Sequence, residues 1–271
     1  MPELPEVETL ANQLKQKLTK RKVHEVEIFQ PDILKCSPEI LQKALSGDRV
    51  QNCYRRGKYL AVEMTRPWIL WFHLGMTGRL LWQENLEDDG HRHLRISFEG
   101  ETSQLFFRDP RRFGKILLTG KSPEAFPSGV KRLGEEPLGL PRESFVGLYK
   151  IRKGRIKNLL LNQSLVAGIG NIYADESLFR AGIHPRKRPF QLSRSILGRL
   201  HEAVCETLQE AIEAGGSSID DYRHTDGMLG HFQERHQVYG REGQACTHCR
   251  QPIKRIVLGG RSSFFCSRCQ R

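Results

Sequence analysis

The chain has 271 residues, of which 38% are apolar, with a formal net charge of +12 and a sequence pI of about 9.5. This length and apolar content can bury substantial cores and predict two domains. The excess of Lys and Arg favours a polyanionic partner, nucleic acid first and an acidic membrane surface second. No run of 18 apolar residues occurs and the acidic N-terminal stretch lacks an apolar core, so we expect neither a membrane-spanning helix nor a secretory signal peptide.

The first eight residues, MPELPEVE, carry the most distinctive chemistry. Pro2 follows the initiator Met, and a small second residue usually allows that Met to be removed, which would leave a free proline amine. An α-amino group titrates near ~7.7–8.0, well below a lysine at ~10.4, so part of it is unprotonated at neutral pH. Such an amine can attack a carbonyl-like carbon and form a Schiff base, and Glu3 could act beside it as an acid or base. An ordinary capped helix is the alternative interpretation.

A helix is predicted over residues 5–20. Val7, Leu10, Leu14 and Leu18 recur at helical spacing, and Pro5 suits the first helical position. The proline amine would then lie beyond the positive end of the helix dipole, which disfavours its protonated form.

The next hundred residues read as short strands punctuated by Gly, Pro, Asn and Asp. The predicted strands are 23–29, 60–64, 69–74, 79–82, 94–98, 105–107 and 115–119, with a helix over 38–45. Short strands at this spacing favour an antiparallel sandwich or a flattened barrel. We therefore predict an N-terminal β-sandwich domain over residues 1–130, flanked by helices.

Three turns in this domain are basic or expose apolar residues. Lys58 lies in the turn RRGKY, Met76 lies in HLGMTG after His73, and Arg111 and Phe113 lie in RDPRRFG. A Met or Phe in a turn is more often ordinary core packing. An enzyme that acts on a base, however, must extrude it from the stack, and apolar wedges beside an Arg can fill the gap.

The second half is predicted to be helical. Residues 121–141 are rich in Pro and Gly and read as an interdomain linker, which we bound at 131–141. Helices are expected over 142–151, 155–162, 172–181 and 193–214, within a domain spanning 142–239. The long polar stretch 215–239 is either a functional lid or disordered.

A glycine-rich turn at residues 163–171 precedes the third of these helices. Asn171 can cap that helix, and a helix N-terminus preceded by Gly can bind an anion. The alternative is a plain interhelical turn. The basic residues upstream favour a phosphate contact: Arg152, Lys153, Arg155 and Lys157.

The strongest sequence signal lies in residues 240–271. Cys246 and Cys249, and Cys266 and Cys269, form two C-x-x-C pairs separated by 16 residues. This spacing predicts one structural zinc ion held by four thiolates, with disulfides or free thiols as the alternative. A β-hairpin is predicted from strands 253–258 and 262–266 around two glycines. It would place Arg261 near its tip as a phosphate contact.

The other three cysteines are Cys36, Cys53 and Cys205, which are scattered along the chain. This usage suits a reducing cytosol better than a disulfide framework, so we expect inert thiols and a cytoplasmic location, associated with the nucleoid through DNA binding.

Over nearly its whole length the sequence resembles the bacterial formamidopyrimidine-DNA glycosylases, which remove oxidised purines in base excision repair. The matching motifs, in order, are MPELPEVET, RRGKYL, HLGMTG, RDPRRFG, GIGNIYADE and CTHC…GGRSSFFCSRCQ. The resemblance implies an α+β multi-domain fold: an N-terminal antiparallel β-sandwich, then a helical helix-two-turn-helix domain with a zinc-finger β-hairpin. It also implies duplex DNA containing an oxidised purine or an abasic site as substrate, and a monomer.

The resemblance also implies roles for individual residues. Pro2 would attack C1′, Glu3 would donate a proton, and Lys58 and Arg261 would assist β- and δ-elimination. The implied DNA contacts are His73, Met76, His91, Arg111, Phe113, Arg152 and Asn171. A loop containing Ser217, Ser218, Arg223 and Thr225 would close over the damaged base.

Two rival functions are weighed against this one. An endonuclease VIII-like enzyme would act on oxidised pyrimidines, but Leu4 and the Met76, Arg111 and Phe113 set argue for the oxidised-purine side. A non-catalytic DNA-binding protein with a zinc ribbon would explain the charge and the cysteines. It would not explain the Pro2-Glu3 start or Lys58.

Overall fold

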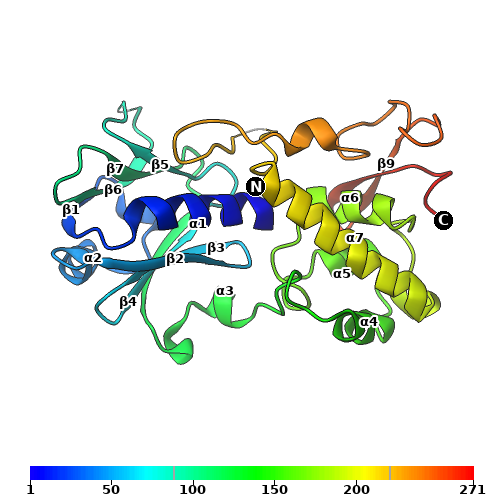
Figure 1. The fold of residues 1–271 in the computed structure, drawn as a ribbon, viewed down its shortest axis with the longest axis horizontal. Helices are drawn as coiled ribbons and strands as arrows, with labels where there is room; N and C mark the ends of the chain where they lie inside the picture. Colours follow the sequence, from blue (N-terminus) through cyan, green and yellow to red (C-terminus); the bar gives the residue numbers. More distant parts are fainter. Residues whose placement is uncertain (88, 220) are drawn as a thin grey trace. The chain divides into compact units, whose positions relative to one another are not determined.

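The computed structural model describes every residue of the chain except Asp88 and Asp220. Backbone contacts divide the chain into two compact units (Figure 1). The first unit comprises Met1–Lys131 and Ala214–His231, and the second comprises Arg132–Glu213 and Phe232–Arg271. Each unit has its own core.

The first unit contains two antiparallel four-stranded sheets, as the predicted β-sandwich requires. One sheet has the strand order β1-β6-β7-β5 and the other has the order β2-β3-β4-β8. The strands are β1 Val23–Ile28, β2 Val50–Arg56, β3 Tyr59–Met64, β4 Trp68–His73, β5 Arg79–Gln83, β6 Arg92–Phe98, β7 Gln104–Arg108 and β8 Lys115–Gly120. The short helical elements of this unit are α2 Pro38–Leu45, η1 Pro31–Ile33, η2 Pro123–Ala125 and α3 Ser128–Lys131.

Helix α1, Leu4–Leu18, lies against the second sheet and confirms the predicted N-terminal helix (Figure 1). Its buried stripe includes Val7, Leu10, Leu14 and Leu18, the positions whose spacing predicted it. The helix ends before Lys20, which takes a left-handed conformation with φ 71°. Burial of this stripe fixes which face of the helix meets the sheet.

The core lies between the two sheets. Phe72 of β4 and Phe107 of β7 are fully buried, and their rings stack with centroids 5.7 Å apart. On the other face of the second sheet, Trp71 packs against Phe126 with centroids 5.2 Å apart, next to Val130. Since β4 is covered on both faces, its sequence is a continuous apolar run rather than an alternating one.

Strand β2 is missing from the predicted set. Only Val50 and Cys53 of this strand are buried, so polar residues hide its alternating pattern. A register shift between Val50 and Asn52 further breaks the alternation. β2 is an edge strand of its sheet, where polar side chains are common.

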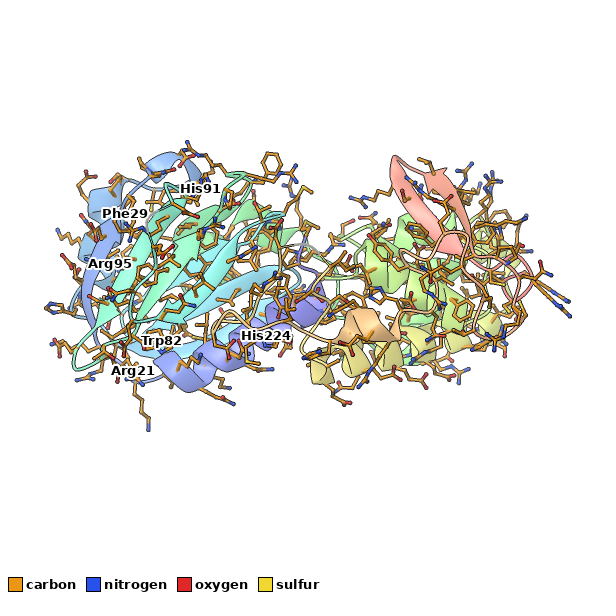
Figure 2. All side chains as sticks on the ribbon, turned by 90° about the horizontal axis from the view of Figure 1, so that it is seen from above. Arg21, Phe29, Trp82, His91, Arg95 and His224 are labelled. Carbon is orange, nitrogen blue, oxygen red and sulfur yellow. The ribbon has the colours of Figure 1, made fainter. Side chains whose placement is uncertain are left out.

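Some arginines of the first unit have partners within that unit. Arg95 of β6 lies 3.2 Å from Glu25 and 2.6 Å from Glu27 on the neighbouring strand β1. Arg21 lies over the ring of Trp82, 5.7 Å from its centroid (Figure 2). The Arg95 pairs thus link two neighbouring strands of one sheet.

The segment Ala214–His231 belongs to the first unit, not to the helical domain predicted over 142–239. The backbone N–H of Ser217 donates to Oε1 of Glu6 at 2.7 Å, and the hydroxyl of Tyr222 donates to the carbonyl of Glu6 at 3.3 Å. Tyr222 is part of the sandwich core. Periodicity along the chain carries no signal for such long-range attachment.

The second unit is built from four main helices and the predicted C-terminal hairpin. The helices are α4 Arg142–Lys150, α5 Ile156–Leu160, α6 Asn171–Arg180 and α7 Arg194–Glu213; the short turns are η3 Pro189–Gln191 and η4 Phe232–Arg235. Strands β9 Lys254–Leu258 and β10 Arg261–Phe265 pair antiparallel. The cysteine-rich segment packs on this unit through Phe179 and Val238. Among the described residues, no helix combines the length and apolar character needed to cross a bilayer.

Residues 131–141, predicted to be an interdomain linker, belong to the second unit from Arg132 onward. The N–H of Gly134 donates to the carbonyl of Gln163 at 2.8 Å, and the N–H of Ala167 donates to the carbonyl of Glu135 at 2.9 Å. Pro and Gly predicted an irregular backbone here correctly, but they do not report packing.

We expect Gly134→Ala to destabilise the protein by ~1–3 kcal/mol, the range for overpacking a filled site. A Cβ at residue 134 would lie 2.2 Å from the carbonyl oxygen of Leu165, where only backbone could yield. The matched control is Gly139→Ala, because nothing lies within 4 Å of a Cβ at that position. Urea unfolding of both variants measures the difference; equal stabilities would contradict the packing described for residues 132–141.

Candidate functional site

The N-terminal residues are held in a single conformation at the start of α1. Pro2 is buried and Glu3 is 3% exposed, whereas Met1 is half exposed. Glu3 is the N-cap residue: its side chain accepts from the backbone of Glu6, and Oε2 of Glu6 accepts from the N–H of Glu3 at 2.8 Å. This reciprocal capping box fixes the direction in which the chain before α1 points.

Lys58 lies in the turn between β2 and β3 and is 8% exposed. The preceding strand is tied to α1 because Nε of Arg55 lies 2.7 Å from Oε2 of Glu8. Tyr59 pairs with His73, so the Lys58 turn lies at the end of the sheet where β4 finishes. The fold thus brings Lys58, His73 and the first half of α1 to one end of the second sheet.

His73 is neutral at physiological pH in this environment. Burial, with Lys58 and Lys115 nearby, lowers the pKa of its imidazole to about 4. The N–H of Gly75 donates to its Nδ1 at 3.2 Å, which requires that nitrogen to be unprotonated. The neutral ring therefore fixes the beginning of the turn that carries Met76.

The two turns predicted to carry wedge residues lie together and are organised by Asp109. One carboxylate oxygen of Asp109 bonds the hydroxyl of Thr77, and the other accepts from the N–H of Gly114 at 2.7 Å. Met76 and Phe113 are 42% and 52% exposed, which confirms that neither is core packing.

The guanidinium carbon of Arg111 lies 4.9 Å from the Phe113 ring centroid. Gly75 takes a φ of +60°, and a Cβ there would lie 2.6 Å from the carbonyl carbon of Phe113. The two turns can approach this closely only because residue 75 has no side chain.

His91 is hydrogen-bonded to the turn that contains Asp109. Its carbonyl accepts from the N–H of Asp109 at 3.0 Å, and its own N–H donates to Asp89 at 3.1 Å (Figure 2). Its side chain is partly exposed. Asp109 therefore connects three segments that sequence analysis singled out separately.

The residues predicted to close over the damaged base differ in burial and in their hydrogen bonds. Thr225 is fully buried and its hydroxyl bonds Gln13 at 3.1 Å and Lys17 at 2.8 Å, so it anchors the loop on α1. Ser217 is 4% exposed and held by Glu6, while the hydroxyl of Ser218 accepts from the N–H of Gly230 at 2.9 Å.

Further hydrogen bonds within the loop involve Arg223 and His224. The N–H of His224 donates to the carbonyl of Met228 at 2.9 Å, and the His224 ring lies 2.8 Å from the carbonyl of Gly215. Arg223 is partly exposed and donates to the carbonyl of Tyr222 at 2.8 Å. With Asp220 left aside, segment 214–231 is hydrogen-bonded to itself and to α1 at several points.

Asn171 occupies the first position of α6, and Gly170, not Asn171, is the N-cap. The predicted capping role is therefore wrong, and the buried Oδ1 of Asn171 has no hydrogen-bond partner among the described residues. Arg152, between α4 and α5, is partly exposed.

The predicted phosphate-favouring role of Lys157 is also not supported by its position. This side chain is fully buried and lies 2.8 Å from Oδ1 of Asp175. The sequence showed a basic run, but helix α5 turns this member of the run inward.

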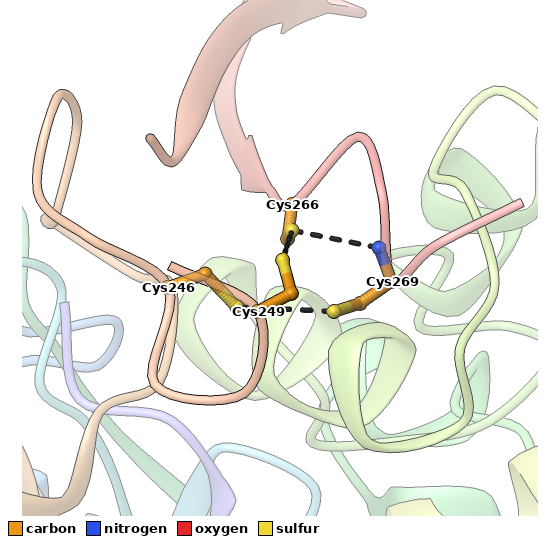
Figure 3. A group of neighbouring side chains, drawn as sticks. All are labelled: Cys246, Cys249, Cys266 and Cys269. Atoms are coloured by element: carbon orange, nitrogen blue, oxygen red, sulfur yellow. Dashed lines mark hydrogen bonds between the residues drawn. The ribbon is translucent and has the colours of Figure 1, made fainter. Parts of the chain in front are cut away.

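The four predicted zinc ligands converge at the base of the hairpin (Figure 3). Their sulfur atoms lie within 4.8 Å of one another, with Cys249 and Cys266 3.3 Å apart and Cys246 and Cys269 3.9 Å apart. Tetrahedral zinc with bonds of ~2.3 Å separates thiolates by roughly 3.8 Å, so the donor set fits one structural zinc ion. With four protein ligands the site has no open position for catalysis.

Arg261 lies at the first position of β10, directly after the two-glycine turn, and is exposed. This confirms the predicted position near the hairpin tip. Sequence analysis did not predict the structural role of three buried carboxylates, Glu6, Asp109 and Asp175. All three lie within the quoted motifs, but what each contacts is not encoded locally.

Comparison with known proteins identifies the class of protein to which the chain belongs. The chain matches the Formamidopyrimidine-DNA glycosylase N-terminal domain over residues 1–116, the H2TH domain of these enzymes over residues 133–223, and the zinc finger found in FPG and IleRS over residues 243–271. The fold and site are therefore those of a DNA glycosylase with a helix-two-turn-helix domain and a zinc finger.

Full-length relatives narrow the class to one family. The formamidopyrimidine-DNA glycosylases of Solibacter usitatus and Bacillus subtilis are 43% and 40% identical to the chain and are aligned over 100% of it and over 100% and 99% of their own lengths. The Lactococcus lactis Fpg in complex with DNA containing an abasic site has a TM-score of 0.91 at 37% identity, covering 99% of both chains. The Thermus thermophilus MutM (Fpg) structure has a TM-score of 0.88 at 38% identity, covering 99% of this chain and 98% of that one. The chain belongs to the formamidopyrimidine-DNA glycosylase family.

We expect the stability of the protein to fall as the pH decreases from about 6.5 to 4, partly through His73. Because the folded pKa of His73 (about 4) lies below that of an exposed histidine (~6.5), the unfolded state binds the proton more tightly in this window. This difference in pKa contributes at most roughly 3 kcal/mol to the free energy of unfolding, and the contribution is complete above pH 6.5. NMR titration should show the His73 ring neutral at pH 6; a titration midpoint near 6.5 would contradict the geometry at Gly75. His73→Gln should flatten the fall in stability.

We expect one zinc ion per chain, lost on Cys249→Ser, because removing one thiolate opens a four-ligand site. Cys205→Ser is the control, since Cys205 lies outside the cluster. Native mass spectrometry gives the metal content. Full zinc retention by Cys249→Ser, or metal loss in the Cys205 variant, would show that another ligand set is used.

Proposed function

We propose that the protein is a bifunctional DNA glycosylase and AP lyase of base excision repair. It excises oxidised purines, 8-oxoguanine and formamidopyrimidines, from duplex DNA and then cleaves the strand. The observation that carries this proposal is the fixed Pro2-Glu3 start at the head of α1, on the same unit as Lys58 and the exposed wedge turns. The solved Lactococcus lactis relatives hold DNA with an abasic site or a Fapy-dG lesion, in support of this substrate class.

Pro2 acts as the nucleophile after Met1 is removed. Its secondary amine attacks C1′ of the damaged nucleotide, and the C1′–N bond breaks with its electron pair leaving on the base. Glu3 protonates the departing base and regains a proton from the amine nitrogen. It then protonates O4′ as the C1′–O4′ bond breaks and the nitrogen lone pair forms the iminium. The hydrogen bond from the backbone of Glu6 to this carboxyl supports a fixed position for the acid at the start of α1.

The resulting iminium makes the sugar an electron sink, and strand cleavage needs no oxidant or nucleotide cofactor. In β-elimination, a proton leaves C2′ and the C3′–O3′ bond breaks, its electrons going to the 3′ phosphate. In δ-elimination, a proton leaves C4′ and the C5′–O5′ bond breaks in the same way. Lys58 assists the first elimination and holds phosphate; Arg261 assists the second by stabilising the departing phosphate.

DNA binding uses both units. Met76, Arg111 and Phe113 enter the duplex where the damaged nucleotide has been extruded, the apolar pair filling the gap and the guanidinium facing the unpaired base. Further contacts with the phosphate backbone come from His73, His91, Arg152 and Asn171. The free Oδ1 and the helix N-terminus at Asn171 suit a backbone-facing polar contact.

The loop residues Ser217, Ser218 and Arg223 bound the damaged base, and Thr225 anchors that loop to α1. The zinc ion is structural: it holds the hairpin that carries Arg261. A single chain acts as a monomer on DNA in the cytoplasm, where it associates with the nucleoid.

Borohydride reduction in the presence of a duplex containing 8-oxoguanine should trap a covalent protein–DNA adduct with the wild type and none with Pro2→Gly. Borohydride reduces the iminium between the attacking amine and C1′ to a stable C–N bond, so the adduct marks the residue that attacked the sugar. A chain that keeps a tag before Pro2 should also fail, and peptide mapping should place the adduct at Pro2.

Two outcomes would contradict the proposal. An adduct that maps to an internal lysine would remove Pro2 from the mechanism, and DNA binding without any adduct would favour a non-catalytic protein. Trapping on a thymine glycol duplex serves as the substrate control; if it exceeds trapping on 8-oxoguanine, the enzyme acts on oxidised pyrimidines instead.

A further inference from the structure

A buried ion pair joins α5 to α6 in the second unit. Nζ of Lys157 lies 2.8 Å from Oδ1 of Asp175, and both side chains are completely buried. Burial raises the pKa of Asp175 to about 7, with the ammonium of Lys157 opposing that shift. Since apolar residues in place of such pairs often leave stability unchanged or increased, this pair is poorly explained by stability alone.

Each member of the pair also holds one backbone group of β10. Nζ of Lys157 donates to the carbonyl of Ser262 at 2.8 Å, and Oδ2 of Asp175 accepts from the N–H of Phe264 at 2.9 Å. β10 pairs with β9 on one side only, and alternate residues of a strand turn their backbone groups away from the partner strand. The two side chains therefore bond the open edge of β10 where a third strand would otherwise lie.

The turn of the hairpin contacts the same helix. A Cβ at Gly259 would lie 3.0 Å from Nδ2 of Asn158, the residue after Lys157. Arg261 lies between this close approach and the anchored carbonyl of Ser262. Its backbone is thus held from both sides, while its side chain is exposed.

The pair also fixes the hairpin relative to the helix that begins at Asn171. Asp175 is four residues, about one turn, further along α6. A single ion pair therefore connects the element carrying Arg261 with the element carrying Asn171, two of the phosphate contacts proposed for this unit.

We propose that Lys157 and Asp175 are positioning residues for δ-elimination, which hold Arg261 in register with Asn171. This inference rests on the proposed function and on the role of Arg261 within it. The pair does not touch the sugar; it acts by limiting where the guanidinium of Arg261 can meet the departing 5′ phosphate. Loss of the pair should slow the second elimination selectively and leave Schiff-base formation intact.

The experiment uses the zinc-loaded full chain and a duplex with one abasic site under single-turnover conditions. It measures the ratio of δ- to β-elimination product and, separately, the rate of borohydride trapping. For Asp175→Asn we expect the product ratio to fall about ten- to a hundredfold, since small misplacements of a catalytic group have effects of this size. The trapping rate should stay within about twofold of wild type. Asp175→Glu, which keeps the charge, should restore part of the ratio.

A double-mutant cycle with Arg261→Ala separates positioning from general destabilisation. If the pair acts through Arg261, adding Asp175→Asn to Arg261→Ala should lower the ratio no further. The matched control is Glu210→Gln, which removes the exposed ion pair of Arg180, also on α6, and should leave the ratio unchanged. If Asp175→Asn does not fold, the double variant Lys157→Gln/Asp175→Asn is used in its place, because it leaves no unpaired buried charge.

The inference is overturned if the folded, zinc-loaded variant keeps the wild-type product ratio, or if its loss adds to that of Arg261→Ala. Equal losses of trapping and of δ-product would also overturn it, because they indicate a general structural defect. Failure of the proposed function is distinguishable, since the wild type itself would then give no trapped adduct.

Discussion

The carboxylate of Glu6 is the interaction on which the proposed active site depends most. Fully buried, it accepts the N–H of Glu3 with one oxygen and that of Ser217 with the other. The first contact sets the conformation of the residues that carry the proposed nucleophile and acid. The second holds the segment Ala214–His231 on the sandwich unit, although Ser217 and Glu6 are 211 positions apart in the chain. A buried carboxylate with two backbone donors is satisfied, whereas without them it would be strongly disfavoured.

A second buried carboxylate plays a comparable part at the wedge turns. Asp109 receives the hydroxyl of Thr77 and the N–H of Gly114, and its own N–H reaches the carbonyl of His91. The exposed Met76 and Phe113 therefore stand on a rigid, hydrogen-bonded base. The wedge role proposed for these two side chains would benefit from this base, since ordering a flexible turn on binding DNA would reduce the binding affinity.

The basic residues of the chain separate into two groups once the fold is known. Arg95 and Lys157 are bound to acidic partners and serve the architecture. Others, such as Arg111, Arg152 and Arg261, lie in turns or at a strand end, partly or fully exposed. Net charge alone favoured a nucleic acid, but only the exposed group can contact phosphates. The zinc ligands and the Lys157–Asp175 pair then both act on the hairpin of the second unit, one at its base and one along its edge.

The sequence by itself determined the N-terminal helix α1, most strands of the sandwich, the zinc site and the hairpin that carries Arg261. These features depend on local periodicity, turn residues and ligand spacing, which neighbouring positions encode. Tertiary structure alone decided that β2 is an edge strand, that residues 214–231 join the first unit, and that Lys157 faces inward to Asp175. It also decided that Gly170, not Asn171, caps α6. Each of these outcomes rests on a contact between residues distant in the chain, or on backbone geometry set by packing, so no local pattern could reveal it.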